Sequence, residues 1–275
     1  MLHVRQPAVS GRFYPASPTV LRATVERYLR TARGTCVHPK ALIVPHAGYE
    51  YSGPIAASAY AALAPKRDMI RRVVLLGPAH RLLFDGLAAS AAKAFRTPLG
   101  SVPVDRLAVE RALELPQVRI LDAAHRDEHC LEVQLPFLQM VLPEFQVAPF
   151  LVGNATPDEV GQMLELLWGG DETLIVVSSD LSHYHEYDEA RQFDRSAGQA
   201  IESLDPERLH SEQACGSIAI RGLLLAARKS GLVAQTLDLR NSGDTAGQRD
   251  QVVGYGAFVF EQPVPTTAIP GDRST

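Results

Sequence analysis

The 275-residue chain has few cysteines, one tryptophan and no excess of positive charge. Its three cysteines are widely spaced and make no disulfide framework, which fits a reducing compartment. Lys and Arg number 27 against 31 Asp and Glu, so the formal charge of -4 provides no positive field to hold a nucleic acid. No apolar run approaches membrane-spanning length, and residues 1–10 contain no run of signal-peptide type. We therefore expect a cytoplasmic protein that binds neither nucleic acid nor membrane.

The composition is that of an ordinary globular domain, with 46% hydrophobic and 21% charged residues. Short continuous apolar runs are typical of strands buried on both faces of a parallel sheet, and they occur at Ala41–Pro45, Val73–Leu76, Gln146–Val152 and Thr173–Val177. Helical patterns separate these runs. The alternation predicts one α/β domain over residues 1–261, with a mostly parallel or mixed central sheet flanked by helices on both faces. Residues 262–275, rich in Pro, Thr and Gly, are predicted to be a disordered tail.

Several less regular segments carry weaker expectations. Ala88–Phe95 is predicted to be one irregular strand, Pro54–Leu63 a small-residue helix, and Val233–Leu239 an alternating edge strand. Residues 182–186 give no strand signal and are expected to form a loop.

Polar side chains follow three of the predicted buried strands. His46 follows the first, His80 follows the second through Gly77-Pro78-Ala79, and Asp180 and His183 follow the strand that ends near Val177. Ligands of open α/β sheets bind at the carboxyl ends of the strands. A single histidine in such a place is more often structural, but three such placements together predict a functional site at this edge.

Cys215 stands in Ala214-Cys215-Gly216-Ser217, at the start of a helix predicted over 214–229. A helix N-terminus favours the thiolate, the form that binds metals or attacks carbon. A cysteine beside Ala and Gly is also commonly a small buried hydrophobe, so both interpretations stand. Cys36 lies in a predicted loop without a partner in view, and Cys130 is expected to pack rather than react.

Six short motifs in this order resemble the Memo family, whose prokaryotic members are known as protein B of the AmmeMemoRadiSam system. The resemblance covers about residues 5–260, and it is carried by Gly11-Arg12-Phe13-Tyr14, Pro45-His46-Ala47-Gly48-Tyr49, Gly77-Pro78-Ala79-His80, Asp127-Glu128-His129, Ser178-Ser179-Asp180 with His183, and Ala214-Cys215-Gly216.

The resemblance implies the fold of the class III extradiol (LigB-like) dioxygenases, which use non-haem iron. By this likeness His46 and His80 match the two histidine ligands, and Cys215 stands where those dioxygenases have a glutamate ligand. His183 matches their acid/base histidine, and His129 is implied as a further active-site histidine. The implied cofactor is a divalent metal, with Fe(II) as the first expectation. Cu and Zn are alternatives because a thiolate is a softer ligand than a carboxylate.

Three functions are consistent with these residues. The first is a dioxygenase-like metal-dependent oxidoreductase acting on a small, phenolic substrate, with Asp180 orienting His183 as acid/base and Phe13, Tyr49 and Tyr51 as an aromatic wall. The second is a zinc hydrolase that uses a His-His-Cys site, with His183 or Glu128 as the base. The third is a non-catalytic adaptor that binds a peptide in the same cleft. The resemblance further implies a pathway shared with a radical S-adenosylmethionine enzyme and an AMMECR-like protein.

Overall fold

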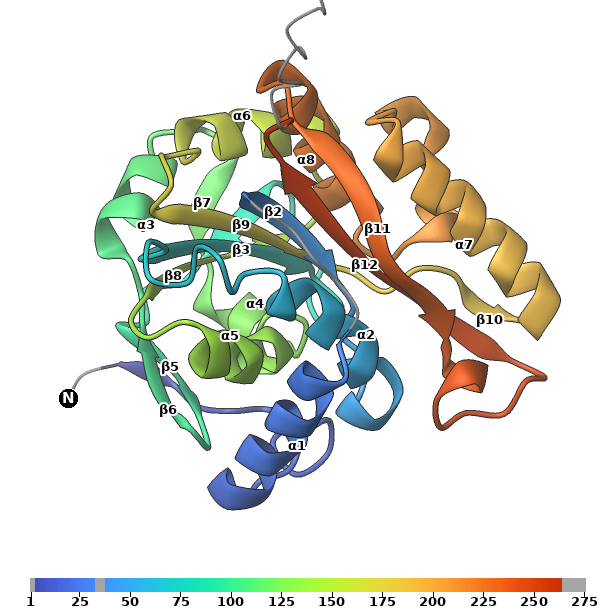
Figure 1. Cartoon of the computed structure of the whole chain (residues 1–275). Coiled ribbons are helices and arrows are strands. Elements are labelled where there is room, and N and C mark those ends of the chain that lie inside the picture. The colour runs from blue at the N-terminus through green and yellow to red at the C-terminus, as the bar shows by residue number, and fades with distance from the viewer. Residues whose placement is uncertain (1–2, 33–37, 264–275) are drawn as a thin grey trace, which may run out of the picture.

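The computed structural model describes residues 3–32 and 38–263, which form a sheet covered by helices on both faces (Figure 1). The order across the large sheet is β10-β12-β2-β9-β3-β8-β4-β7, with β11 paired to β12 outside this path. Its strands are β2 (Pro39–Val44), β3 (Arg72–Pro78), β4 (Leu87–Ala89), β7 (Val118–Ile120), β8 (Gln146–Val152), β9 (Thr173–Ser178), β10 (His183–His185), β11 (Val233–Asn241) and β12 (Val252–Glu261).

The sheet is mixed around a parallel centre. Strands β2, β9, β3 and β8 run parallel to their neighbours, as expected for continuous apolar runs buried on both faces. Strand β12 is antiparallel to β2 and to β11, and β4 is antiparallel to β8. A smaller sheet joins β1 (Val4–Arg5), β5 (Ala94–Thr97) and β6 (Gly100–Pro103). The predicted α/β domain with a mostly parallel or mixed sheet is confirmed.

The helices lie on both sides of the large sheet. Helix α2 contacts β2, β11 and β12 and packs against α5 and α1, whereas α6 and α8 pack together on the opposite face, and α7 lies along β11 and β12. The α-helices are α1 (Pro18–Arg30), α2 (Tyr49–Ala61), α3 (Arg106–Ala112), α4 (Asp122–Arg126), α5 (Leu135–Val141), α6 (Pro157–Leu166), α7 (Tyr187–Glu202) and α8 (Ser217–Lys229). In the described part of the chain, four 3₁₀ turns complete the elements: η1 (Glu132–Gln134), η2 (Pro206–Arg208), η3 (Ser211–Gln213) and η4 (Ser242–Asp244).

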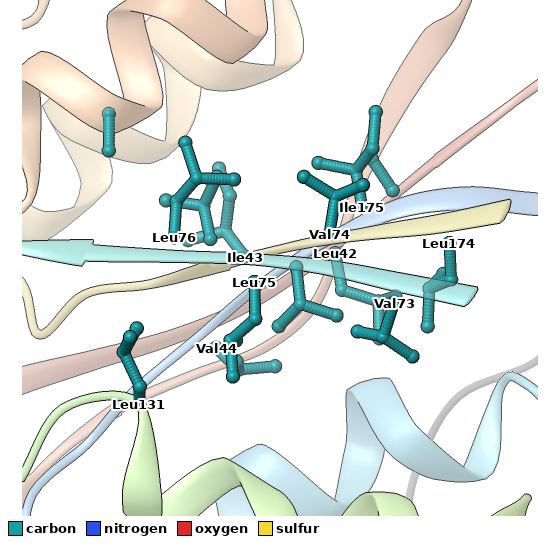
Figure 2. Packing of buried hydrophobic residues seen from close by; sticks show 14 of the residues in the cluster. Leu42, Ile43, Val44, Val73, Val74, Leu75, Leu76, Leu131, Leu174 and Ile175 are labelled. Carbon is teal, nitrogen blue, oxygen red and sulfur yellow. The ribbon is translucent and has the colours of Figure 1, made fainter. Parts of the chain in front are cut away.

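The core is continuous through the sheet. Figure 2 shows Val74 and Leu76 of β3 on one face and Val73 and Leu75 on the other, because successive side chains of a strand point to opposite faces. All four are fully buried. Both layers of helices therefore pack on the central strands, and because β2, β9, β3 and β8 are parallel, their carboxyl ends lie at the same edge of the sheet.

Three expectations about irregular segments were wrong in detail. The chain over Ala88–Phe95 divides into β4 of the large sheet and β5 of the small one, because β4 pairs with β8 while β5 pairs with β1 and β6. Residues 183–185 form β10 through pairing with β12, with Tyr184 at a φ of 62°. Helix α2 begins at Tyr49, ahead of Pro54. Each difference arises from long-range pairing or packing that local pattern does not contain.

Within the described residues no helix is both long enough and apolar enough to cross a lipid bilayer. Residues 264–275 of the predicted tail and Cys36 lie outside the described residues.

Candidate metal centre

Three of the predicted donors meet at one edge of the sheet. His46 follows β2, His80 follows β3, and Cys215 precedes α8. One potential ligand atom from each side chain lies within 4.8 Å of the others, and Cys215 Sγ is 3.3 Å from His46 Nε2. The strand ends predicted that His46 and His80 meet, and the family resemblance implied that Cys215 joins them; the structure brings all three together, so they could hold a metal ion.

A buried hydroxyl selects the tautomer of His46. Ser178 Oγ donates to the carbonyl of Cys130 at 2.7 Å and accepts from Gln134 Nε2 at 2.8 Å. A hydroxyl has one proton, so the 3.0 Å contact between Ser178 Oγ and His46 Nδ1 requires the ring to donate. The proton therefore lies on Nδ1, and the lone pair of Nε2 points to the side of Cys215.

Glu128 selects the tautomer of His80 in the same way. Its Oε1 accepts from His80 Nδ1 at 2.9 Å, and its Oε2 accepts from the His80 backbone N–H at 2.7 Å. A carboxylate only accepts, so His80 Nδ1 carries the proton and Nε2 is left as the ligand atom. Carboxylates commonly orient metal-binding histidines in this manner.

The Glu128 carboxylate also holds the following turn. Its Oε1 accepts from the backbone N–H groups of His129 at 2.8 Å and Cys130 at 3.1 Å. Burial would raise the pKa of Glu128, but hydrogen bonds from His129 and His80 outweigh burial and hold the pKa below its usual range. This carboxylate is therefore ionised, and three of its four hydrogen bonds converge on Oε1.

The turn Ser178-Ser179-Asp180 ties two of the donors together. Asp180 Oδ1 accepts from the His46 backbone N–H at 2.7 Å, and the Asp180 carbonyl accepts from the Cys215 N–H at 3.3 Å. Ser179 Oγ accepts from the N–H of Gly216 at 2.9 Å. A Cβ on Gly216 would lie 2.8 Å from the Ser179 side chain, so only glycine lets α8 approach this closely.

Protonation of the donors follows from burial. Burial lowers the pKa of His46 to about 4, although the carboxylates of Asp180 and Glu128 oppose this, so the ring is neutral at pH 7 as a ligand must be. Burial, reinforced by the charge of Asp180, raises the pKa of Cys215 to about 12. The expectation that the helix N-terminus favours the thiolate is wrong for the metal-free site. Helix α8 does start near Cys215, at Ser217, but desolvation outweighs its dipole.

The other predicted catalytic residues are placed differently. His129 stacks on His80 with ring centroids 4.8 Å apart, and its Nδ1 is buried 3.0 Å from Glu128 Oε1. Asp180 bonds to His46, and no hydrogen bond joins it to His183 in the part of the chain described. The His183 ring packs on Tyr184, with centroids 5.8 Å apart.

The three aromatics expected to contact substrate divide into two kinds. Tyr49 is buried, and its hydroxyl donates to the carbonyl of Val133 at 2.6 Å, so its polar group is already used within the core. Phe13 packs on His129 with ring centroids 4.8 Å apart. Tyr51 is half-buried at the start of α2. Of these three aromatic residues, Phe13 is the one whose ring contacts a predicted active-site histidine, His129.

Two supporting residues were not identified from sequence in these roles. Ser178 immediately follows the buried run Thr173–Val177, so its position at a strand end was a usable signal. Gln134 carried no such signal, because it reaches Ser178 and the carbonyl of Pro45 only through the packing of η1 against β2. Glu128 was considered as a base, whereas the structure makes it a hydrogen-bond acceptor for two histidines.

The donor set fits a transition metal. Two imidazoles held through Nδ1, which leaves each Nε2 as the ligand atom, and one thiol form a mixed nitrogen–sulfur set, which suits Zn, Cu or Fe better than Mg or Ca. Both imidazoles are oriented through Nδ1, as in well-ordered metal sites.

Comparison with known proteins gives a consistent result. The Memo-like protein family matches residues 5–259. A "MEMO1 family protein" of Aquifex aeolicus is 35% identical over 270 residues, covering 94% of this chain and 100% of the relative. One from Aeropyrum pernix is 38% identical over 283 residues, covering 93% and 99%. The crystal structure of an uncharacterized protein from Escherichia coli K12 aligns with a TM-score of 0.53 at 12% identity, covering 80% of this chain and 99% of that one, which shows the shared fold.

Proposed function

We propose that this chain, which belongs to the Memo-like protein family, binds a divalent transition metal through His46, His80 and Cys215. With this metal it acts as an oxidoreductase on a small substrate. The observation that carries the proposal is the convergence of the three donors within 4.8 Å, with both imidazole Nδ1 atoms occupied by Ser178 and Glu128. Fe(II) is the first metal to test, because the family resembles extradiol dioxygenases, and a phenolic compound is the first substrate class.

A bound Fe(II) or copper ion would supply one-electron redox chemistry at this edge of the sheet. The chain's own residues prepare the site for it. Ser178 and Glu128 fix the two imidazoles, and Asp180 fixes the backbone of His46. His129 stacks on His80, and its Nδ1 is buried 3.0 Å from Glu128 Oε1, so the proton exchange with substrate proposed for this ring would use Nε2.

A zinc hydrolase is the second candidate, because two histidines and one cysteine match a known catalytic zinc set. Glu128 would be a poor base for that reaction. Its oxygens accept from four backbone and ring N–H groups, and its pKa is held low by the hydrogen bonds of His129 and His80. A hydrolase would therefore depend on His129 or His183.

Metal analysis after anaerobic reconstitution tests the proposal. Wild type and the variants His46→Ala, His80→Ala and Cys215→Ala are incubated with Fe(II), Cu(II) or Zn(II), desalted and analysed for metal content. We expect one ion per chain in the wild type and loss in each variant. His38→Ala is the matched control, since His38 is exposed and precedes β2, whereas His46 follows the other end of that strand. Full metal content in all three donor variants would refute the site, and preference for Zn with ester or amide hydrolysis would favour the second candidate.

A further inference from the structure

A cavity of about 570 Å³ opens beside Cys215, between the chain segment after β3, the end of β8 and the first turns of α8. This volume is in the usual range for small-molecule sites. The residues that line it are Pro78, Ala79, Leu82, Leu83, Phe84, Asp85, Val152, Gly153, Asn154, Cys215, Gly216, Ile218 and Ala219. The cavity thus shares Cys215 with the candidate metal centre, and Ala79 is the neighbour of His80 in the chain.

The cavity wall is held together by main-chain hydrogen bonds. The N–H of Ala79 donates to the carbonyl of Val152 at 3.0 Å, and the N–H of Asn154 donates to the carbonyl of Phe84 at 2.7 Å. A Cβ on Gly153 would lie 2.2 Å from the Phe84 carbonyl oxygen, so the close approach requires glycine here. The wall is therefore preformed, which reduces the entropy lost on binding.

The lining is mostly apolar, and its one charged side chain is acidic. Leu83 is 98% exposed and Leu82 is 37% exposed at the cavity edge. A ligand that covers these side chains would remove apolar surface from water, which favours binding. Asp85 Oδ1 accepts from Asn154 Nδ2 at 2.9 Å, and no hydrogen bond to Oδ2 is found in the described part of the chain. No Lys, Arg or His is among the lining residues, so a carboxylate or phosphate inside the cavity would lack a counter-charge in its wall. The guanidinium of Arg119 lies outside this wall, 5.8 Å from the Phe84 ring centroid, and lines the adjoining pocket with Asp85.

We propose that this cavity binds a small apolar amine in its ammonium form. The apolar body of the ligand lies against Leu82, Phe84 and Ile218, and the ammonium group pairs with Asp85. Binding itself depends only on the cavity. That the ammonium group belongs to the substrate of the neighbouring centre, beside the phenol named for that substrate, rests on the proposed function, because Cys215 belongs to both the cavity and the centre.

Three probes of similar shape separate charge from apolar contact: 2-phenylethylamine, 2-phenylethanol and 3-phenylpropionate. Each is titrated into metal-free protein labelled with ¹³C at the leucine methyl groups, and the shifts of Leu82 and Leu83 give the dissociation constant. We expect the amine to bind most tightly and the carboxylate most weakly. Asp85→Asn should weaken amine binding by about threefold to fivefold, the upper part of the range for an exposed ion pair, and leave the alcohol unchanged. Asp68→Asn is the control, since Asp68 is an exposed carboxylate outside the lining.

A second variant tests the apolar wall. Ile218→Trp should reduce binding of all three probes by filling the cavity, whereas Leu107→Trp, at an exposed leucine outside the lining, should not. Equal binding of amine and carboxylate, or an Asp85→Asn variant that binds the amine like wild type, would overturn the inference. So would leucine shifts that spare Leu82 and Leu83. Metal content is measured on the same variants. Amine binding without metal binding would refute the proposed function alone, and metal binding without amine binding would refute only the cavity assignment.

Discussion

Ser178 Oγ lies 3.0 Å from His46 Nδ1 and accepts a hydrogen bond from the N–H of that ring nitrogen, because the hydroxyl already donates its own proton to the carbonyl of Cys130. The relationship ties the chemistry of a histidine after β2 to the last residue of β9, the neighbouring strand. It explains why the free lone pair of His46 faces Cys215, and it can be tested directly.

Ser178→Ala should weaken metal binding about 10-fold to 100-fold, the usual effect of removing a residue that orients a metal-binding histidine. The measurement is competition against a chelator of known affinity. Ser90→Ala is the matched control, since Ser90 is buried and its hydroxyl donates to Asp122 Oδ1 at 2.7 Å. An unchanged affinity in Ser178→Ala would show that the tautomer of His46 is set by something other than this hydroxyl.

Glu128→Gln should weaken the hydrogen bonds that hold the ring and backbone of His80, although glutamine has the same shape as glutamate. The amide keeps the shape but loses the charge and one acceptor, so one N–H group of His80, His129 or Cys130 is left unpaired. We expect a loss of roughly 1.5–3 kcal/mol in the free energy of unfolding, together with weaker metal binding. Denaturant titration measures the first effect. Glu144→Gln, at an exposed position, should leave both quantities unchanged.

Metal affinity should rise with pH. The pKa of Cys215 is raised to about 12 by burial and by Asp180, so the thiol is protonated in the metal-free protein at pH 7–9. Binding as a thiolate must then release one proton, and the affinity should increase about tenfold per pH unit over this range. Proton release can be recorded in a weakly buffered indicator solution. The Cys215→Ala variant should bind weakly and lack this slope; a wild-type affinity independent of pH would argue against thiolate ligation.

His183→Ala should retain the metal. The His183 ring contacts Tyr184, and no hydrogen bond joins it to the three donors within the described residues. If it acts as the acid/base on a true substrate, turnover should fall by on the order of 10² to 10⁴. His46→Ala, by contrast, should lose the ion itself. Metal analysis of the two variants side by side distinguishes the roles, and an empty His183→Ala would make His183 a ligand and reopen the assignment of Cys215.

The stability of the metal-free protein should fall in mild acid because of buried His125. Burial lowers the pKa of this ring from 6.5 to about 4, and the ring bonds to the carbonyl of Ala88 at 2.9 Å. The unfolded chain takes up the proton more readily, so the stabilisation is complete above pH 6.5 and is lost as the pH falls to 4. The loss is about 3 kcal/mol over this window.

His125→Gln should flatten this dependence, since the amide can donate to Ala88 without titrating. Denaturant unfolding at several pH values, compared with wild type, measures the difference. The comparison is needed because burial raises the pKa of Asp194 to about 6, which acts in the opposite direction in the same window. His38→Gln, at an exposed histidine, should follow the wild-type profile; an identical profile for His125→Gln would refute the assignment.

The sequence by itself determined the strand-and-helix alternation and two of the three donors. Apolar runs such as Val73–Leu76 reveal buried parallel strands because burial on both faces leaves little room for polar residues. Once the strands are parallel, residues just beyond their carboxyl ends must share an edge, which is why His46 and His80 could be predicted to meet. The assignment of Cys215 as the third donor came from family resemblance, and the structure brings it to the same point.

Only the tertiary structure decided which groups support those donors. Glu128 contacts His80 across 48 residues, Gln134 contacts Ser178 across 44, and Asp180 bonds to His46 across 134. Such pairs depend on strand register and on how loops pack over strand ends, neither of which leaves a local periodicity. The pKa of Cys215 is a further case. The chain places the thiol near a helix N-terminus, which favours the thiolate, but folding also buries it beside Asp180, and the cost of desolvating a charge is the larger effect.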